Sequence, residues 1–320
     1  MEQERTEWLN ARRKGIGGSD VGAILGLSPF KSPVDVWLNK TGRSSPQVDN
    51  DAMWWGRILE DPIAKRYEYE TGEQVEVVSE ILYDKNNPVL LANIDRAVKR
   101  NEQPAYKDGI FNTNKILEIK TARSRSYDWG AYGTDKVPDY YLTQCLHYLG
   151  ITGATVCDLA ALFFDVRIMG IYKIEADFDF IEKIKARLLD WWETYVVADK
   201  EPPTRSMNDI QRLYRKSTAT SKVADENIEM EIRKLSQIRA EEKYLLDEIE
   251  HAKYLICEYL KDSETLTDLK GKALATFKAN KTRLDVDWEE IVRECKIPES
   301  IILKHTKVKQ PNRILRLKKQ

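Results

Sequence analysis

The chain lacks several features that define whole classes of protein. Its four cysteines, at positions 145, 157, 257 and 295, show no CxxC or zinc-type spacing, and its three histidines form no cluster with them. This argues against a disulfide framework and a structural zinc site. The sequence has no apolar run long enough to span a bilayer, and its first six residues show no charged-then-apolar leader. We therefore expect a soluble, reduced, cytoplasmic protein.

An excess of charge of one sign is also lacking. The 51 Lys and Arg residues almost balance the 52 Asp and Glu residues, which leaves a formal net charge of −1. The whole chain therefore carries no electrostatic signature of nucleic-acid binding. Local basic patches are still compatible with this balance, because affinity for phosphate follows the distribution of charge rather than its total.

The length of 320 residues suits one main domain with an appendage. A polar, proline-containing stretch over 201–226 interrupts the periodic segments, so we expect a domain over 1–200, a linker over 201–226 and a further region over 227–320. In that region, apolar residues from Ile228 to Tyr259 recur mostly every three or four places, which predicts one long amphipathic helix suited to packing, assembly or partner binding. A small α+β tail should follow, with strands over 271–278 and 313–318 and a helix beginning near Asp287.

Helical and strand patterns are mixed within the first 200 residues. Helices are predicted over 51–72, 138–150 and 178–196, and strands over 88–95, 115–120, 155–164 and 166–174. Pro62 should kink or end the first helix, which would place Glu60 at a kink or boundary. The expected fold class is α/β (α+β), with a mixed central sheet flanked by helices.

Charged side chains follow apolar runs in two of these strands. Asp95 ends the first strand, and Glu118 and Lys120 alternate with apolar residues in the second. Because alternate side chains of a strand share a face, Glu118 and Lys120 should point the same way as Ile116. Two carboxylates and an ammonium group suit a metal-dependent nuclease, because cations held by carboxylates stabilise charge on the oxygens of a phosphodiester. The simpler interpretation is a half-exposed hairpin with a cross-strand salt bridge.

A second candidate site lies near the beginning of the sequence. A basic run that includes Arg12 leads into two glycines followed by Ser19 and Asp20, either of which is a natural cap for a helix over 21–25. Free backbone N–H groups, a hydroxyl and a guanidinium together suit a phosphate. Simple helix capping beside a solvated basic run is the alternative.

Aromatic and histidine side chains give weaker signals. Trp37, Trp54 and Trp55 could stack on bases at a frayed duplex end, but we expect Trp54 or Trp55 to pack beside the helix that carries Glu60. His147 is expected to make a core or supporting hydrogen bond rather than to bind metal.

The order Glu60, Asp95, Glu118-x-Lys120, Gln144 resembles the PD-(D/E)XK nuclease core of the phage lambda exonuclease group. Four segments, over 15–20, 25–29, 55–61 and 141–149, more closely resemble the YqaJ-type viral recombinase family. The proline that names the superfamily is absent before Asp95, as it is in many of its members. The resemblance covers the first 200 residues or so, judged from several independent motifs.

This resemblance implies a restriction-endonuclease-like core and a Mg²⁺-dependent double-stranded DNA exonuclease, with Mn²⁺ as a possible substitute. Cleavage would run 5′-to-3′ and leave a 3′ overhang for phage or prophage recombination by strand annealing. Asp95, Glu118 and the backbone carbonyl of Ile119 would bind the metal, with Glu60 directly or through water. Lys120 would orient or deprotonate the attacking water, and Gln144 would hold that water or the scissile phosphate. Arg12 and Ser19 would bind the 5′-terminal phosphate.

The implied partners are double-stranded DNA ends, a RecT/Bet-like single-strand annealing protein and further copies of the chain, in a trimeric ring around DNA. The setting would be the cytoplasm of a bacterial cell, without a membrane. Two other interpretations stay open. One is a structure-specific or CRISPR-associated-type endonuclease of the same superfamily, although the missing cysteine quartet argues against an iron–sulfur version. The other is a catalytically inactive DNA clamp or recombination mediator.

Overall fold

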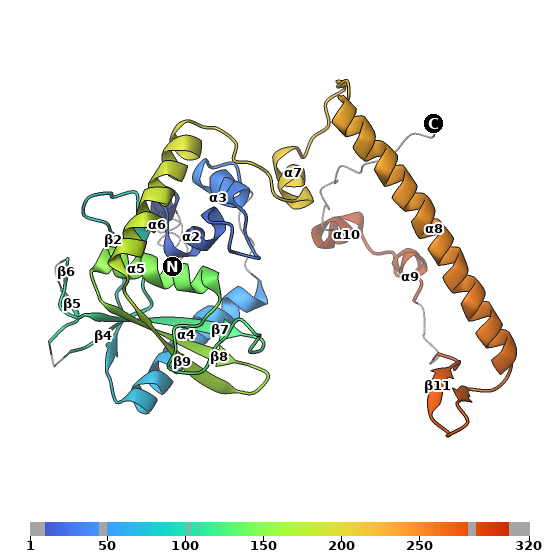
Figure 1. Ribbon diagram of the computed structural model, residues 1–320, viewed down its shortest axis with the longest axis horizontal. Coiled ribbons are helices and arrows are strands. Elements are labelled where there is room, and N and C mark those ends of the chain that lie inside the picture. Colours follow the sequence, from blue (N-terminus) through green and yellow to red (C-terminus); the bar gives the residue numbers. More distant parts are fainter. Residues whose placement is uncertain (1–9, 45–49, 101–102, 108, 281–285, 307–320) are drawn as a thin grey trace. The chain divides into compact units, whose positions relative to one another are not determined.

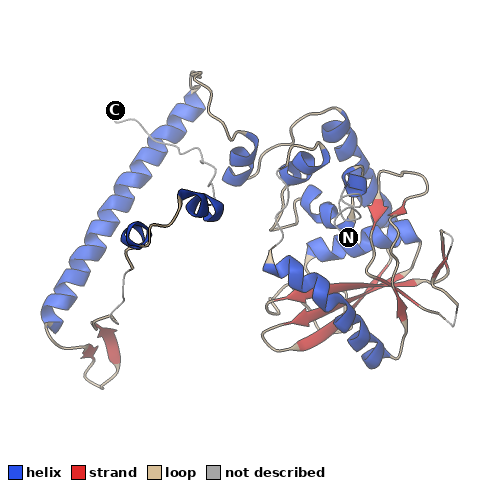
Figure 2. Cartoon of the chain, turned by 180° about the vertical axis from the view of Figure 1, so that it is seen from behind, coloured by secondary structure: helices blue, strands red, loops and turns tan. Residues whose placement is uncertain are grey.

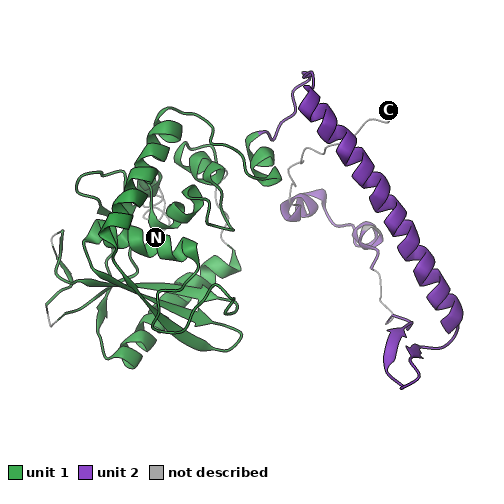
Figure 3. Cartoon of the chain, in the orientation of Figure 1, with its two compact units in different colours: residues 1–213 green, residues 214–320 purple. Residues whose placement is uncertain are grey.

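The computed structural model describes residues 10–44, 50–100, 103–107, 109–280 and 286–306. The chain separates into two compact units, residues 1–213 and 214–320 (Figure 3). The segment 201–226, expected to be a linker, contains helix α7 (Met207–Leu213), which belongs to the first unit. Within that unit the Asp209 carboxylate accepts a hydrogen bond of 2.5 Å from the hydroxyl of Ser32 at the start of helix α3 (Pro33–Lys40).

A five-stranded mixed sheet forms the centre of the first unit (Figure 1). Its strands lie in the order β1 (Val75–Glu76), β4 (Arg96–Val98), β7 (Lys115–Ala122), β8 (Val156–Phe163) and β9 (Ile168–Glu175). β7 and β8 are parallel, and the other neighbours are antiparallel. Helix α5 (Asp139–Thr152) makes the crossover that a parallel pair requires. The predicted strands over 115–120, 155–164 and 166–174 are confirmed.

Helices cover both faces of this sheet (Figure 2). Helices α2 (Gly18–Ile24), α5 and α6 (Phe178–Trp191) share one apolar core with Ile116 of β7. On the other face, helix α4 (Asp51–Thr71) packs Ile63 and Tyr67 against Leu117 and Ile119. The expected alternation along β7 is therefore confirmed, and so is the predicted fold class of a mixed sheet flanked by helices.

Smaller elements complete the first unit. β2 (Leu82–Tyr83) pairs with β3 (Leu91–Ala92), and β5 (Tyr106–Lys107) pairs with β6 (Ile110–Phe111), each in a separate two-stranded sheet. A π-helical segment, η1 (Trp192–Val197), continues α6, so that the two together cover the predicted helix over 178–196.

Two elements around the acidic residues differ from expectation. Helix α4 runs through Pro62, so the proline does not end it and Glu60 does not lie at a helix boundary; burial of Ile63 and Tyr67 against the sheet outweighs the missing N–H of the proline. The strand expected over 88–95 is instead β3 followed, after a break, by β4. Asp95 precedes β4 because its carboxylate accepts a hydrogen bond from the backbone N–H of Ile119. That N–H is then not available to extend the backbone pairing between β4 and β7.

Two helix ends also differ from expectation. Helix α5 continues past Gly150 to Thr152 and ends where Gly153 takes the left-handed conformation, with φ of 73°. Helix α2 begins at Gly18 with Gly17 as its N-cap. Ser19 and Asp20 therefore lie inside its first turn, and the prediction that one of them caps the helix was wrong.

The first helix of the second unit is the predicted long helix, α8 (Glu226–Leu260). β10 (Thr265–Thr267) and β11 (Ala273–Thr276) form an antiparallel pair, followed by α9 (Trp288–Glu294), whose N-cap is Asp287 as expected, and α10 (Glu299–His305). The sequence did not predict β10 or α10. The strand expected over 313–318 lies outside the described residues. Within the described part of the chain, none of the helices is both long and apolar enough to cross a membrane.

Candidate active site

Two carboxylates lie side by side where β4 and β7 pair. The antiparallel register joins Arg96 with Leu117, so the next step along the strands sets Asp95 opposite Glu118. The Asp95 carboxylate accepts a hydrogen bond of 2.7 Å from the backbone N–H of Ile119. The sheet itself therefore holds both acids on one face, the face that α5 covers.

Glu118 is the more deeply buried acid, with 2% of its surface exposed. Its Oε1 accepts hydrogen bonds from the Lys120 ammonium and, at 2.5 Å, from the Gln144 amide. Its Oε2 is buried and has no hydrogen-bond partner among the described residues. Burial raises the pKa of Glu118, against the attraction of Lys120. A buried carboxylate oxygen without a partner needs a proton or a cation.

The ionisation of Asp95 and Lys120 follows from the same crowding. Burial, with the charge of Glu118 second, raises the pKa of Asp95 to about 7. Burial alone would lower the pKa of Lys120, but the two carboxylates outweigh it and raise that pKa. Without a bound metal ion, Lys120 is therefore protonated and supplies the positive charge beside the two acids.

Glu60 reaches this region from α4 but is held by another residue. Its Oε1 accepts a hydrogen bond of 2.5 Å from Arg96, whose other terminal nitrogen bonds Asp61. Burial and the nearby charge of Asp95 raise the pKa of Glu60, while Arg96 opposes the shift. The acid is therefore close enough to Asp95 to sense its charge, and it is paired with a guanidinium.

Gln144 is oriented by a residue that the sequence analysis missed. Its Nε2 also donates to the hydroxyl of Tyr148 at 3.1 Å. Tyr148 lies one helical turn after Gln144 on α5, and that i, i+4 spacing was the available signal. A Cβ at Gly18 would lie 2.4 Å from the Tyr148 ring, so only glycine allows α2 this close. With both Nε2 hydrogens engaged, the amide oxygen remains to accept a hydrogen bond.

One cleft of about 490 Å³ is lined by Glu60, Asp95, Lys120 and Gln144, and the buried Glu118 is bonded to the last two. Its lining includes Ser19 of α2, Gly56 and Glu60 of α4, Lys120 of β7 and Gln144 of α5. Four helices and strands that are distant in sequence thus contribute to a single hollow.

The predicted phosphate-binding residues also meet. Arg12 Nη2 donates to the hydroxyl of Ser19 at 3.0 Å. Behind them, the buried Asp20 accepts hydrogen bonds from the Gly17 N–H at 3.2 Å and from the Lys40 ammonium at 2.7 Å. Lys40 also donates to the backbone carbonyl of Arg12 at 2.9 Å. The Lys40–Asp20 pair therefore fixes the backbone that carries Arg12 and Ser19.

The tryptophans and His147 differ in how well they were predicted. Trp54 and Trp55 lie on α4 itself, the helix that carries Glu60, where they are 47% and 50% exposed and pack edge to face on one another rather than in the core. Trp37 is buried and donates its indole N–H to a backbone carbonyl. His147 is buried and bonds the Leu91 carbonyl at 3.0 Å, which confirms the expected core hydrogen bond.

The donor atoms of the site fit a hard divalent cation. Asp95, Glu118 and the backbone carbonyl of Ile119 supply oxygen, the ligand that Mg²⁺ prefers, and the unpartnered Glu118 Oε2 is a ready ligand. Across the described ranges, no group of three acidic, histidine or cysteine side chains is gathered to hold a metal. A cation here would therefore keep several waters, as Mg²⁺ commonly does.

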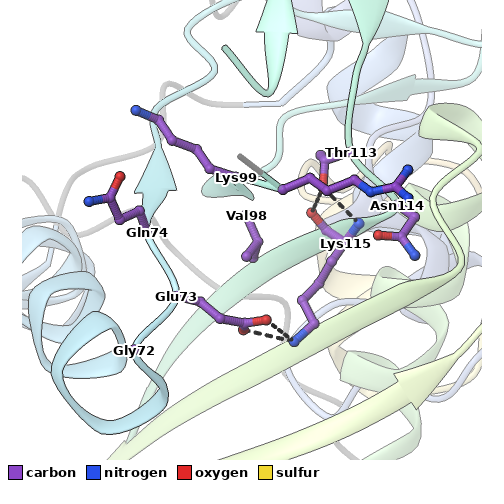
Figure 4. Close-up of a pocket in the computed structure, with 9 residues that line it drawn as sticks. Gly72, Glu73, Gln74, Val98, Lys99, Thr113, Asn114 and Lys115 are labelled. Atoms are coloured by element: carbon purple, nitrogen blue, oxygen red, sulfur yellow. Dashed lines mark hydrogen bonds and ion pairs between the residues drawn. The ribbon is translucent and has the colours of Figure 1, made fainter. Parts of the chain in front are cut away.

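A second hollow, of about 460 Å³, lies beside the strand ends at Lys115 (Figure 4). There Lys115 bonds Glu73 at 2.8 Å and Asp158 at 3.0 Å. The hydroxyl of the buried Tyr67 lies 2.6 Å from each of the same two acids. None of the predicted site residues lines this hollow, and the Glu73 and Asp158 carboxylates are already bonded to Lys115 and Tyr67.

Comparison with known proteins relates the chain to one family. The model of the YqaJ-like viral recombinase domain matches residues 7–155. The protein YqaJ of Bacillus subtilis (strain 168) is 30% identical over 267 residues, which cover 78% of each chain. The protein R354 of Acanthamoeba polyphaga mimivirus is 26% identical over 160 residues, covering 49% of this chain and 28% of that protein.

Two solved structures are also similar. One is an alkaline exonuclease, LHK-Exo, from Laribacter hongkongensis, with a TM-score of 0.45, 19% identity and coverage of 61% of this chain and 93% of that one. The other is a phage related exonuclease from Haemophilus somnus 129PT, with a TM-score of 0.41, 15% identity and coverage of 58% and 95%. The family match and the relationship to the Bacillus protein show that the chain belongs to the YqaJ-like viral recombinase family.

Proposed function

We propose that the protein is a metal-dependent nuclease that degrades double-stranded DNA from its ends. The observation that carries the proposal is that Asp95, Lys120 and Gln144 line one open cleft while the buried Glu118 is bonded to the last two of them. Two acids with raised pKa values, one of them with an unpartnered oxygen, are costly to maintain for the fold alone. Such an arrangement is suited to hydrolysis of a phosphodiester.

Each side chain has a role in that reaction. Asp95, Glu118 and the Ile119 carbonyl would hold Mg²⁺, or Mn²⁺ in its place. When bound, the ion would supply charge that stabilises the attacking and leaving oxygens, and it would weaken the hold of the two acids on the Lys120 proton. Lys120 is then placed to orient the attacking water and to exchange a proton with it. The free amide oxygen of Gln144 can accept a hydrogen bond from that water.

Cleavage is proposed to run 5′-to-3′ and to leave a 3′ overhang for recombination by strand annealing. The supporting observation is that Ser19 lines the cleft while Arg12 bonds its hydroxyl, so a terminal phosphate could bind beside the acids.

Arg12→Ala should therefore slow digestion of 5′-phosphorylated ends about tenfold more than that of 5′-hydroxyl ends, the size expected for a charge-assisted hydrogen bond. Arg13→Ala removes the same charge from the adjacent, exposed position and is the matched control. Equal losses on both kinds of end would remove the role in end recognition.

The decisive experiment incubates the protein with linear duplex DNA labelled separately at each end and with a closed circle. Release of mononucleotides from the 5′ label should require Mg²⁺ and Lys120, and Lys120→Ala should reduce the rate by at least about 100-fold, within the range for loss of a proton-transfer group. The circle should stay intact. Cutting of the circle would indicate an endonuclease, and DNA binding without hydrolysis would indicate a clamp or mediator.

The proposal extends to partners. A 3′ overhang is the substrate of a single-strand annealing protein, so we propose that such a protein binds the nuclease and loads on the exposed strand. A trimeric ring around the duplex would keep the enzyme on its track. The exposed apolar residues of α8, among them Leu245 and Ile249, offer a surface for one of these contacts.

A further inference from the structure

Arg96 links the two strands of the candidate metal site to helix α4. Its register partner on β7 is Leu117, so its side chain points to the α4 face of the sheet, opposite to that of Asp95. Only 5% of the side chain is exposed. Nη1 donates at 2.5 Å both to Glu60 Oε1 and to the backbone carbonyl of Asp95, and Nη2 bonds Asp61. One guanidinium thus contacts the backbone of a proposed metal ligand and two carboxylates of the helix.

This contact decides what Glu60 can do. A guanidinium buried this deeply needs the charge of its carboxylate partners, because an unpaired buried charge is strongly unfavourable. Of the two acids, Asp61 is largely exposed, with 78% of its side chain accessible, whereas Glu60 is 34% exposed and supplies the more sheltered counter-charge. Direct binding of a cation by Glu60 would have to compete with Arg96 for the same carboxylate.

We propose that Arg96 is a positioning residue that holds Glu60 away from direct metal coordination and leaves Asp95, Glu118 and the Ile119 carbonyl as the protein's own ligands. Glu60 then acts on the cation through water. The guanidinium also fixes the backbone of Asp95 at the point where β4 begins. This inference rests on the proposed function, because it concerns how the proposed metal is held.

The test is a double-mutant cycle on Mn²⁺ affinity, measured by electron paramagnetic resonance of free Mn²⁺ with the full-length chain and no DNA. Glu60→Gln in the wild-type background should weaken binding by only about threefold, the effect of a charge at a distance. Arg96→Met should tighten binding, because it removes a positive charge and frees Glu60. In the Arg96→Met background, Glu60→Gln should weaken binding by about tenfold or more, since there the carboxylate can reach the ion.

Non-additivity is the diagnostic result. If the charges acted only through space, Glu60→Gln would weaken Mn²⁺ binding by the same factor in the wild-type and Arg96→Met backgrounds, and that outcome would overturn the proposal. So would a loss from Glu60→Gln alone as large as that from Asp95→Asn. Asp61→Asn is the matched control, because it removes the exposed partner of Arg96 and leaves the Glu60 contact in place; it should change Mn²⁺ affinity by less than about threefold.

Folding and function are controlled separately. Circular dichroism checks that each variant folds. If Arg96→Met does not fold, Arg96→Lys replaces it in the cycle. A lysine keeps the charge but cannot bond two carboxylates at once, so the non-additivity should persist at reduced size. If the cycle is non-additive but the protein cleaves no DNA, only the proposed nuclease function is overturned. If the protein cleaves DNA but the cycle is additive, only the role of Arg96 is overturned. Failure of the wild-type chain to bind Mn²⁺ would overturn both.

Discussion

At the scale of single residues, the candidate site sets like charges together inside the protein. Asp95 and Glu118 face each other across two strands, and Lys120 is the ammonium group placed to compensate them. Burial disfavours the charged form of both acids, and the charge of Glu118 adds to this effect on Asp95. Keeping both acids ionised therefore costs folding free energy, and this cost should be measurable as stability.

Asp95→Asn is expected to stabilise the protein in the absence of divalent cations. The pKa of Asp95 is raised to about 7 from 3.8, so between these values the folded state holds a proton that the unfolded state has lost. Stability therefore falls as pH rises through this range, and the loss is complete above the folded pKa. In EDTA at about pH 8 the variant should melt higher than the wild type, by about 2–4 °C for each kcal/mol relieved, and the gap should narrow towards about pH 5.

Calorimetric melts of both proteins, repeated with Mg²⁺, measure this effect. Added Mg²⁺ should raise the melting temperature of the wild type and change that of Asp95→Asn much less. The variant keeps an oxygen that can accept the Ile119 N–H, so the backbone contact is preserved. A variant that melts lower than the wild type at the higher pH would show that the buried charge is not costly.

The residues of the site differ in how far sequence reveals them. Period-two alternation predicts that Glu118 and Lys120 share a face, because that follows from strand geometry alone. The contact of Arg96 with Glu60 depends on where α4 crosses the sheet, which is set by packing between segments distant in sequence. A contact of this length in the sequence has no local signature. Tyr148, in contrast, could have been found from its spacing to Gln144.

At the scale of elements, polar contacts hold α4 at two points along its course over the sheet. Arg96 engages Glu60 and Asp61 in its middle, and Tyr67 near its end bonds Glu73 and Asp158. Local signals place the ends of this helix well, since Asn50 caps its start and Gly72 takes the left-handed conformation at its end. Pro62 does not end the helix, because the turns that follow it pack against the sheet.

Tyr67→Phe should destabilise the first unit by about 1.5–3 kcal/mol, the usual range for a hydrogen bond to a charged group. The Tyr67 side chain is fully buried, and its hydroxyl lies 2.6 Å from both Glu73 and Asp158. Lys115 still contacts both acids in the variant, which limits the loss. Urea denaturation followed by circular dichroism measures the change.

Tyr69→Phe is the matched control for this experiment. Tyr69 lies on the same helix, is 80% exposed, and should tolerate the change with less than about 0.5 kcal/mol. If both variants lost the same stability, the buried acid network would have no special weight in anchoring α4.

At the scale of the whole molecule, the two units differ in how they bury apolar surface. The first unit has a continuous core on both faces of its sheet. In the second, α8 carries exposed Leu245, Ile249 and Ile256, whose spacing of four and seven residues follows one stripe of the helix. The sequence predicted this stripe from periodicity. Periodicity does not name what packs against it, because the same pattern serves a second copy or another protein.

Assembly through this stripe is the remaining prediction. If α8 joins copies of the chain into a ring, the wild type should sediment at about three times the monomer mass, and Leu245→Glu should shift it towards the monomer, because a charge in a helix seam is strongly disfavoured. Lys243→Glu places the same side chain at an exposed polar position nearby and should leave the mass unchanged. Hydrolysis by the Leu245→Glu variant should continue but release fewer nucleotides per binding event. If the wild type is monomeric at every concentration, the stripe would instead bind a different protein. Pull-down of a purified annealing protein by the wild type but not by the Leu245→Glu variant would identify the annealing protein as the partner of the stripe.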